Sequence, residues 1–363
     1  MLRRLLAFKT VLIVLFGLLL AGCEGLGYYW QAGAGQLDLM QRQTPIDTVV
    51  EDGNIDSAVA SKLTLVLAAR DYAEQMLLLP VGDSYSEFVQ LEGDYAVWNV
   101  YAAEPYSVVS YRWCYALVGC MGYRGYFDRQ EAEQYAAKMA AEGYEVFVGG
   151  VAAYSTLGWF DDPVMSSFTR RSDLALVSLL FHELAHRKLY IKGDTAFNES
   201  YASAVAIIGL QQWQQQAMLS AQQIAQWQQH QQRSSAFHAL LLNYRQQLSV
   251  LYQREDLDQL LMAQHKATIY EQLTRDYQQF RHQWQGYSGY DHWMASVNNA
   301  KLATVADYYI WVDSFLALYR QSGNDIAEFY RRVNVLSQRP KEDRALQLSE
   351  LKQQYRRGDR VGG

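Results

Sequence analysis

The spacing of apolar positions separates helical from extended segments in the first third of the chain. Residues 55–78 place apolar side chains mostly on one face at helical spacing, and Pro80 and Gly82 follow the last turn, so we predict a helix there. Residues 84–127 are rich in Tyr, Val and Trp, with turn residues between the runs. That composition favours strands over helices.

The remainder of the chain is increasingly helical. A short helix is predicted over 129–142, a strand over 144–155 and a helix over 172–191, and the pattern from 198 to 337 is helical almost throughout. We therefore expect an α+β fold. A small mixed sheet would pack on the helix over 172–191, and a mostly α-helical C-terminal portion would follow.

The chain opens with a short basic region followed by an apolar run. Arg3, Arg4 and Lys9 accompany the apolar residues 10–20, a stretch too short to span a bilayer comfortably. The run ends in LAGC, which resembles the lipobox of bacterial lipoproteins, with Cys23 as the residue to be acylated. The alternatives are a simple signal peptide and a short anchor helix. We favour the lipoprotein because the small residues and the cysteine fall where the apolar run stops.

Charge and composition narrow the class of partner. The chain is 19% charged, with a net charge of -6 and a pI near 5.7, which gives no reason to expect nucleic acid binding. Removing the predicted signal would take away basic residues and leave the mature chain more acidic still. Glu24 follows the lipid cysteine where inner-membrane lipoproteins usually carry Asp. We therefore expect a lipid anchor in the outer membrane, with the protein facing the periplasm.

The cysteines fit an exported protein. With Cys23 used for lipidation, Cys114 and Cys120 remain, and two cysteines in an oxidising compartment are expected to pair as a disulfide. Such a bond would close a short loop and pin a local turn. The alternative is two buried thiols.

Two histidines and a glutamate form the clearest chemical pattern, in LLFHELAHRKLY at 179–190. His182 and His186 are four residues apart, so they lie about 40° apart around a helix axis and can share a metal ion. Glu183 lies beside the first histidine, where it can accept a proton from water that zinc has acidified. The flanking residues are apolar, as expected for a buried helix. The pattern predicts the site of a zinc hydrolase.

A third ligand is needed, with the fourth position left open for water. Gly193 ends the first helix, and Asp194 or Thr195 can cap the next one. Glu199 then comes early in the second helix, where a tight turn between the helices would fold it back toward the histidines. Otherwise Glu199 is an ordinary charge at a helix N-terminus. Asp194 is the nearest alternative ligand or histidine partner, and Asn198 is a further candidate for an outer-shell or substrate contact.

Six segments resemble one known family, the predicted aminopeptidase family of bacterial lipoproteins. The segments are YYWQAGAGQ (28–36), CYALVGCMGYRGYF (114–127), GGVAAYSTLGWFDDP (149–163), FHELAH (181–186), YIKGDTAFNES (190–200) and NNAKLA (298–303). The resemblance covers most of the mature chain. It implies a zinc metallopeptidase with His182, His186 and Glu199 as ligands and Glu183 as base, and an aminopeptidase activity.

Substrate-binding groups are expected by analogy with other Glu-ligand zinc peptidases. In those enzymes an edge strand before the metal helix holds the substrate in extended form, and residues 148–156 lie at a suitable place in the chain. The alternative is a plain sheet strand. An aminopeptidase must also bind a free ammonium, for which Asp161, Asp162 and Asp194 are the candidate carboxylates.

A donor to the developing oxyanion is also expected. The polar and aromatic segment SGYDHWMASVNNAKLA, at 288–303, is unusual among the predicted helices. We single out Tyr290, His292, Asn298 and Asn299 in it as candidates. The alternative is a loop between two helices.

These features divide the chain into five expected segments. A lipoprotein signal peptide occupies 1–22, and a lipidated tether that becomes a docked segment occupies 23–50. The metallopeptidase portion with the zinc site spans 51–210, a helical portion spans 211–340, and a charged tail spans 341–363.

The sequence thus predicts a Zn²⁺-dependent peptidase, an aminopeptidase by resemblance, that acts on peptides in the cell envelope. One alternative is an envelope endopeptidase. The other is a lipoprotein scaffold that binds zinc without catalysis, although a purely structural zinc site does not require Glu183.

Overall fold

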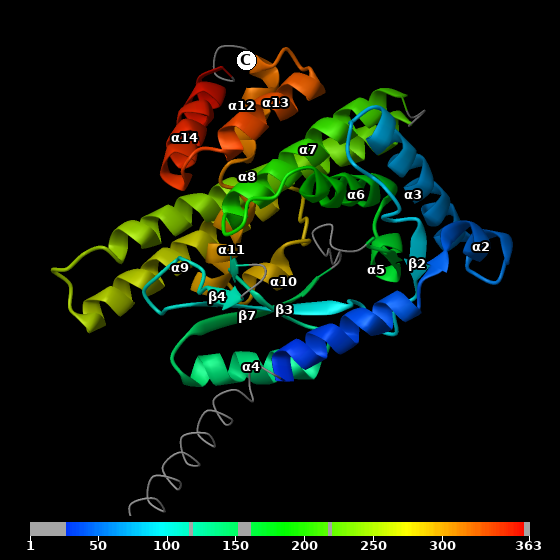
Figure 1. Ribbon diagram of the computed structural model, residues 1–363. Helices are drawn as coiled ribbons and strands as arrows, with labels where there is room; N and C mark the ends of the chain where they lie inside the picture. Colours follow the sequence, from blue (N-terminus) through cyan, green and yellow to red (C-terminus); the bar gives the residue numbers. More distant parts are fainter. Residues whose placement is uncertain (1–26, 116–118, 152–160, 217–219, 359–363) are drawn as a thin grey trace, which may run out of the picture.

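The structure is a computed structural model that describes residues 27–115, 119–151, 161–216 and 220–358 (Figure 1). The expected lipid cysteine, Cys23, and the second half of the expected substrate strand, 152–156, lie outside the described residues. Within them, no helix is both long enough and apolar enough to cross a membrane.

Short strands form three small sheets. The strands are β1 (Thr44–Pro45), β2 (Glu87–Val89), β3 (Val97–Ala103), β4 (Trp113–Tyr115), β5 (Gly119–Met121), β6 (Arg124–Tyr126), β7 (Glu145–Val151) and β8 (Val164–Met165). In the first sheet, β2 is the middle strand and pairs antiparallel with β1 and parallel with β8. In the second, β3 lies between β6 and β7 and is antiparallel to both, and in the third β4 and β5 form an antiparallel pair.

Helices make up most of the described chain, so the expected α+β class with a mostly helical C-terminal portion is confirmed. An N-terminal helix spans 27–41. The other helices are α2 (Ile46–Glu51), α3 (Ser57–Gln75), α4 (Arg129–Ala141), α5 (Ser166–Thr169), α6 (Asp173–Lys188), α7 (Thr195–Gln216), α8 (Ala221–Leu251), α9 (Gln259–Gln283), α10 (Asp291–Met294), α11 (Asn299–Tyr309), α12 (Val312–Gln321), α13 (Ile326–Ser337) and α14 (Lys341–Gly358).

Local sequence explains where the first helices begin and end. The Asp56 side chain accepts hydrogen bonds from the first free amides of α3, and Asp128 does the same for α4. Gly143, with φ of +95°, follows the end of α4 in the left-handed conformation that glycine adopts without strain. These elements therefore agree closely with the helices predicted over 55–78 and 129–142.

The elements stack in layers around the sheet of β3, β6 and β7 (Figure 1). The N-terminal helix and α4 pack on one face of this sheet, where Tyr28 joins a cluster of buried residues from β3, β6 and α4. From the other side α11 contacts β3 and β7, and α11 in turn packs on α7. The helix α6 lies against α7 and α3, and the C-terminal helices lie beyond them.

A close approach of α6 and α7 forms the centre of the largest apolar core. The α6 side chains Leu180, Phe181 and Leu184 are fully buried. Gly209 of α7 makes room for them, because a Cβ at this position would lie only 2.8 Å from the Phe181 ring and 2.6 Å from Leu77. Because residue 209 is a glycine, α6 and α7 can lie close together at this point. Side chains further along the two helices can then meet.

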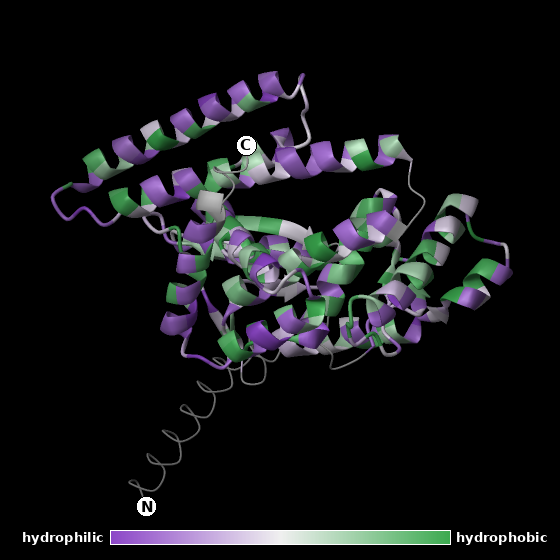
Figure 2. Cartoon of the chain, turned by 90° about the horizontal axis from the view of Figure 1, so that it is seen from above, coloured by the Kyte–Doolittle hydropathy of each residue, from purple (hydrophilic) through white to green (hydrophobic). Residues whose placement is uncertain are grey.

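The two long helices α8 and α9 pair as a hairpin that projects to the left in Figures 1 and 2. Figure 2 shows hydrophilic and hydrophobic residues alternating along both, and the hydrophobic ones include the buried Phe237, Leu241 and Leu273. The boundary expected at residue 210 falls inside α7, which continues to Gln216. The expected metallopeptidase and helical portions therefore share a helix.

Within the expected charged tail of 341–363, the described residues form the helix α14. Leu348 and Leu351 are buried on α14, and it packs against α12. Its Arg344 donates to the Asp194 carboxylate at 2.6 and 3.1 Å, and both side chains are 8% exposed. The sequence alone does not show this pairing, because the partner that neutralises Arg344 lies 150 residues earlier in the chain.

We expect Arg344→Met to destabilise the protein by about 3–5 kcal/mol, because it leaves the buried Asp194 carboxylate with only the more distant and more exposed Lys341, 4.0 Å away. Urea unfolding followed by circular dichroism measures this. Arg331→Met, which removes an arginine whose side chain is 66% exposed, is the matched control and should change stability by less than about 1 kcal/mol. Adding Asp194→Asn to Arg344→Met should recover much of the loss; equal stability of Arg344→Met and the control would contradict the buried pair.

Candidate metal centre

The two histidines of the HExxH motif point to one place from consecutive turns of α6. His182 and His186 lie on the same face of this helix, and their Nε2 atoms are 3.2 Å apart. His186 is almost completely buried, and Phe181, Leu184 and Ala185 beside it are fully buried. The helix is therefore mostly buried around the histidines, as predicted from its apolar flanks, and the His182 side chain is 17% exposed.

Glu199 of α7 completes the group, as predicted from the turn between the two helices. Its Oε2 lies 3.2 Å from Nε2 of His182 and 3.5 Å from Nε2 of His186. Zinc bonds of 2.0–2.2 Å in tetrahedral geometry separate neighbouring ligand atoms by about 3.3–3.6 Å. The three observed separations of 3.2, 3.2 and 3.5 Å are close to this range, so His182, His186 and Glu199 form a group that could hold a metal ion.

The electrostatics differ sharply between the two glutamates. Burial by itself would raise the pKa of the Glu199 carboxyl, but the adjacent imidazoles of His186 and His182 lower that pKa to about 2. Burial raises the pKa of Glu183 to about 8, and the charges of Glu199 and Asp162 add to the rise while His182 opposes it. Glu199 is therefore suited to bind a cation as a carboxylate, and Glu183 lies in surroundings that favour taking up a proton.

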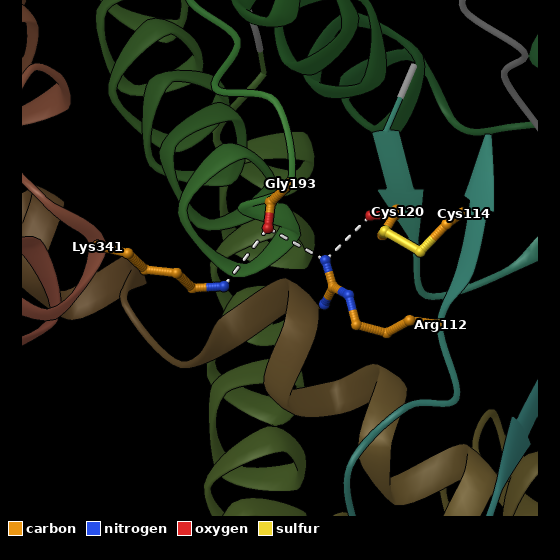
Figure 3. Close-up of a disulfide and its surroundings, with 5 residues drawn as sticks. All are labelled: Arg112, Cys114, Cys120, Gly193 and Lys341. Carbon is orange, nitrogen blue, oxygen red and sulfur yellow. Dashed lines mark hydrogen bonds between the residues drawn. A yellow bond between two sulfur atoms is a disulfide. The ribbon is translucent and has the colours of Figure 1, made fainter. Parts of the chain in front are cut away.

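The loop between α6 and α7 is fastened from two sides (Figure 3). The carbonyl of Gly193 accepts hydrogen bonds from Arg112 at 3.1 Å and from Lys341 at 3.4 Å. Arg112 also donates to the carbonyl of Cys120, which is disulfide-bonded to Cys114 as predicted. The disulfide hairpin β4–β5 and the helix α14 thus both hold the loop that precedes Glu199.

Asn198 holds the same loop from within. Its Oδ1 accepts from the Ile191 amide and its Nδ2 donates to the Ile191 carbonyl, both at 2.8 Å, and its side chain is 1% exposed. These bonds close the turn between the two helices. Asn198 is therefore a positioning residue for Glu199.

Asn198→Ala is expected to lower stability by about 1–3 kcal/mol, because it leaves the Ile191 amide without its partner, while the Ile191 carbonyl still accepts from the Asp194 amide at 3.2 Å. It should also weaken zinc binding by about 10–100-fold, the usual effect of losing an outer-shell contact. Denaturant unfolding and competition with a zinc chelator measure the two effects. Asn334→Ala, at an exposed position of α13, is the control; zinc affinity equal to that of the control would contradict the positioning role.

The expected ammonium-binding carboxylates have different surroundings. Asp194 is paired with Arg344 and also accepts from an α7 amide, so it is neither a metal ligand nor open to a substrate amine. Asp161 lies 3.1 Å from Arg187. Asp162 is 2% exposed, and its charge acts on Glu183. Of the three, Asp162 is the one whose charge is coupled to the candidate base.

The expected substrate strand is an edge strand in its described part. β7 pairs with β3 and lies at one side of the sheet, in the order β6-β3-β7. Residues 148–151 belong to it, and all its residues are only partly buried. No described strand pairs with its outer side, and a strand edge without a neighbouring strand can take up an extended peptide.

The side chains singled out in segment 288–303 mostly make packing and hydrogen-bond contacts within the fold. The four hydrogen-bonding positions of the Asn299 amide are filled: Oδ1 accepts from Tyr252 and Tyr270, and Nδ2 donates to the carbonyls of Glu104 and Pro105. Asn299 therefore has no capacity left for a substrate, which corrects the expectation.

The other candidates of this segment have structural partners or face solvent. Tyr290 stacks on Phe237 in the core of the α8–α9 hairpin, with ring centroids 4.0 Å apart. Asn298 caps α11 and donates to the carbonyl of Val146 in β7. His292 is exposed.

Sequence reasoning missed the tyrosines around Glu199. Burial raises the pKa of Tyr101 on β3 and of Tyr308 at the end of α11, and the charge of Glu199 adds to both shifts. Burial and the charge of Glu199 also raise the pKa of Tyr190, which follows α6. These phenols keep their protons and can donate hydrogen bonds. The chain has 27 tyrosines in all, and nothing in the sequence distinguishes these three from the rest.

The fold and the site define an α+β protein whose HExxH helix and following glutamate form a group able to hold a metal ion. The chain belongs to the family described as "Putative aminopeptidase", which matches residues 27–348. No curated protein and no solved structure matched the chain. The description of this family indicates a peptidase.

Proposed function

We propose that the protein is a zinc-dependent aminopeptidase of the bacterial cell envelope. The observation that carries this proposal is the set of separations among His182, His186 and Glu199, which fits tetrahedral zinc, and in the described part of the chain this group has three members. Glu183 follows directly after the first histidine and is 8% exposed. A site that leaves a coordination position free, with a base beside it, is the arrangement of a hydrolase.

The residues then take distinct roles. When bound, zinc supplies Lewis acidity toward the peptide carbonyl and acidifies water. The Nε2 atoms of His182 and His186 and the carboxylate of Glu199 would hold it. Glu183 takes a proton from the attacking water and returns it to the leaving amine.

Groups around the centre support substrate binding. The edge of β7 would hold the peptide in extended form, as expected for residues 148–156. Tyr101 and Tyr308 are candidates to donate hydrogen bonds to the oxygen on which negative charge develops, because both remain protonated near Glu199. Asp162 is the preferred candidate for the substrate ammonium.

The envelope location rests on the N-terminal sequence. A basic region, a short apolar run and LAGC at 20–23 support cleavage before Cys23 and acylation of this cysteine. The Cys114–Cys120 disulfide agrees with an oxidising compartment. These features support a location on the periplasmic side of an envelope membrane, and Glu24 after the lipid cysteine favours the outer membrane.

Paired peptides with free and acetylated amino termini test the proposed specificity. The purified lipoprotein should hydrolyse free-amine peptides faster than their acetylated partners by about two orders of magnitude or more, because an ammonium site is left unfilled by the acetylated form. Treatment with a chelator should abolish hydrolysis, and added zinc should restore it. Product analysis by mass spectrometry identifies the bond cleaved.

The other outcomes point to the alternative functions. Cleavage of acetylated peptides at internal bonds would replace the aminopeptidase with an envelope endopeptidase. Zinc-loaded protein that hydrolyses neither class would leave a zinc-binding scaffold.

A further inference from the structure

The N-terminal helix carries an uncharged apolar face that is open to solvent. Tyr29, Trp30, Leu37 and Met40 are 55, 79, 55 and 39% exposed. At 100° per residue these four positions lie within about 100° of one another around the helix axis. Asp38, the one charged residue of 27–41, lies about 180° from Tyr29. We propose that this apolar face rests on a lipid bilayer surface.

The opposite side of the helix is firmly attached to the protein. The Gln31 amide donates to the carbonyl of Gly125 at 3.3 Å and accepts from the Phe127 amide at 3.1 Å. Tyr28 stacks on Tyr115, and the Arg124 guanidinium lies 4.0 Å from the centre of the Tyr28 ring. The helix is therefore a fixed part of the fold, and its apolar face cannot turn inward to escape water.

The position of the proposed lipid anchor indicates that a lipid bilayer covers this apolar face. Cys23 lies four residues before Gly27, the first residue of the helix, so their Cα atoms can be at most about 14 Å apart. An acylated Cys23 must lie at the bilayer, which places the start of the helix beside the headgroups. Tyr and Trp are the side chains that favour this interface, and a helix lying in it buries its apolar face about 5–10 Å deep.

This contact would give the enzyme one orientation on the membrane. The N-terminal helix and α4 cover one face of the sheet, whereas α11, α7 and α6 lie on its other side (Figure 1). With the helix on the bilayer, the metal centre is held on the side of the sheet away from the lipid. The inference rests on the proposed anchor at Cys23 and adds a second, non-covalent attachment that a flexible tether would lack.

Fluorescent labels at two adjacent positions test the contact. Leu37→Cys places a label on the apolar face, and Asp38→Cys places it about 100° further round, on the polar side. The labelled lipoprotein is reconstituted in vesicles of phosphatidylethanolamine and phosphatidylglycerol that contain lipids with a spin label on the acyl chain. We expect strong quenching of a nitrobenzoxadiazole label at position 37 and weak quenching at position 38.

Each result has one meaning. Equal quenching at the two positions would overturn the bilayer contact, and a label at position 37 that is shielded from water but not quenched would overturn it in favour of a protein partner. Mass spectrometry of the N-terminal peptide reports acylation of Cys23 separately, and peptide hydrolysis by the same samples reports the proposed activity. The experiment thus tests separately the proposed lipid anchor, the proposed peptidase activity and the proposed contact of the helix with the bilayer.

Discussion

Glu183→Gln is expected to lower kcat/KM for peptide hydrolysis by about 10³-fold or more while zinc stays bound. The substitution keeps the shape of the side chain and removes its ability to take a proton from water, a function that contributes about 10²–10⁴-fold in enzymes. Steady-state hydrolysis and elemental analysis of the same preparation measure both effects. Because the glutamine also removes a buried ionisable group, we expect no loss of stability.

The matched control for this variant is Glu255→Gln, the same change at an exposed position between α8 and α9. It should retain wild-type kcat/KM and zinc content. Hydrolysis by Glu183→Gln at the wild-type rate would rule out Glu183 as the base. Loss of zinc from Glu183→Gln would instead mean that this residue supports the metal.

Glu199→Ala is expected to release the metal. Glu199 is the one anionic member of the group. Burial alone would raise its pKa, but His186 and His182 lower that pKa to about 2, which makes Glu199 a carboxylate at neutral pH. Loss of this ligand should weaken zinc binding by more than the 10–100-fold typical of an outer-shell change. Zinc per chain, measured by elemental analysis after dialysis, should fall from near one to near zero, and hydrolysis should fall with it.

Glu255→Ala is the control for this second variant and should keep its zinc. Glu199→Gln adds a finer comparison, because it keeps the volume of the side chain and removes its charge. Full zinc occupancy in Glu199→Ala would contradict the assignment of this residue as a ligand. Because Asp194 is held by Arg344, it is not expected to replace Glu199.

The parts of the fold that were predicted depend on residues close together in the sequence. α4 and α6 agree with the predicted helices because apolar spacing and capping residues act over a few positions. The candidate metal centre also depends on residues close together in the sequence. His182 and His186 are one helical turn apart, and Glu199 follows across a short turn, so local geometry brings the three together.

The parts that were not predicted depend on distant partners. Residues 341–363 were recognised only as a charged tail, and only the fold shows that Arg344 meets Asp194 in the interior. Asn299 was one candidate for an oxyanion donor, but its four hydrogen-bond partners come from β3–β4, α8 and α9 segments that no local pattern connects to it. Tyr308 lies a few residues beyond the segment singled out, on the helix that segment begins.

The most direct test of the zinc centre is anomalous diffraction at the zinc absorption edge from crystals of the zinc-loaded protein. The account predicts a single strong peak about 2.0–2.2 Å from Nε2 of His182, Nε2 of His186 and the carboxylate of Glu199, with Glu183 close by but not bound. A peak with Glu183 as a fourth ligand, or an active protein with no peak at this position, would contradict it.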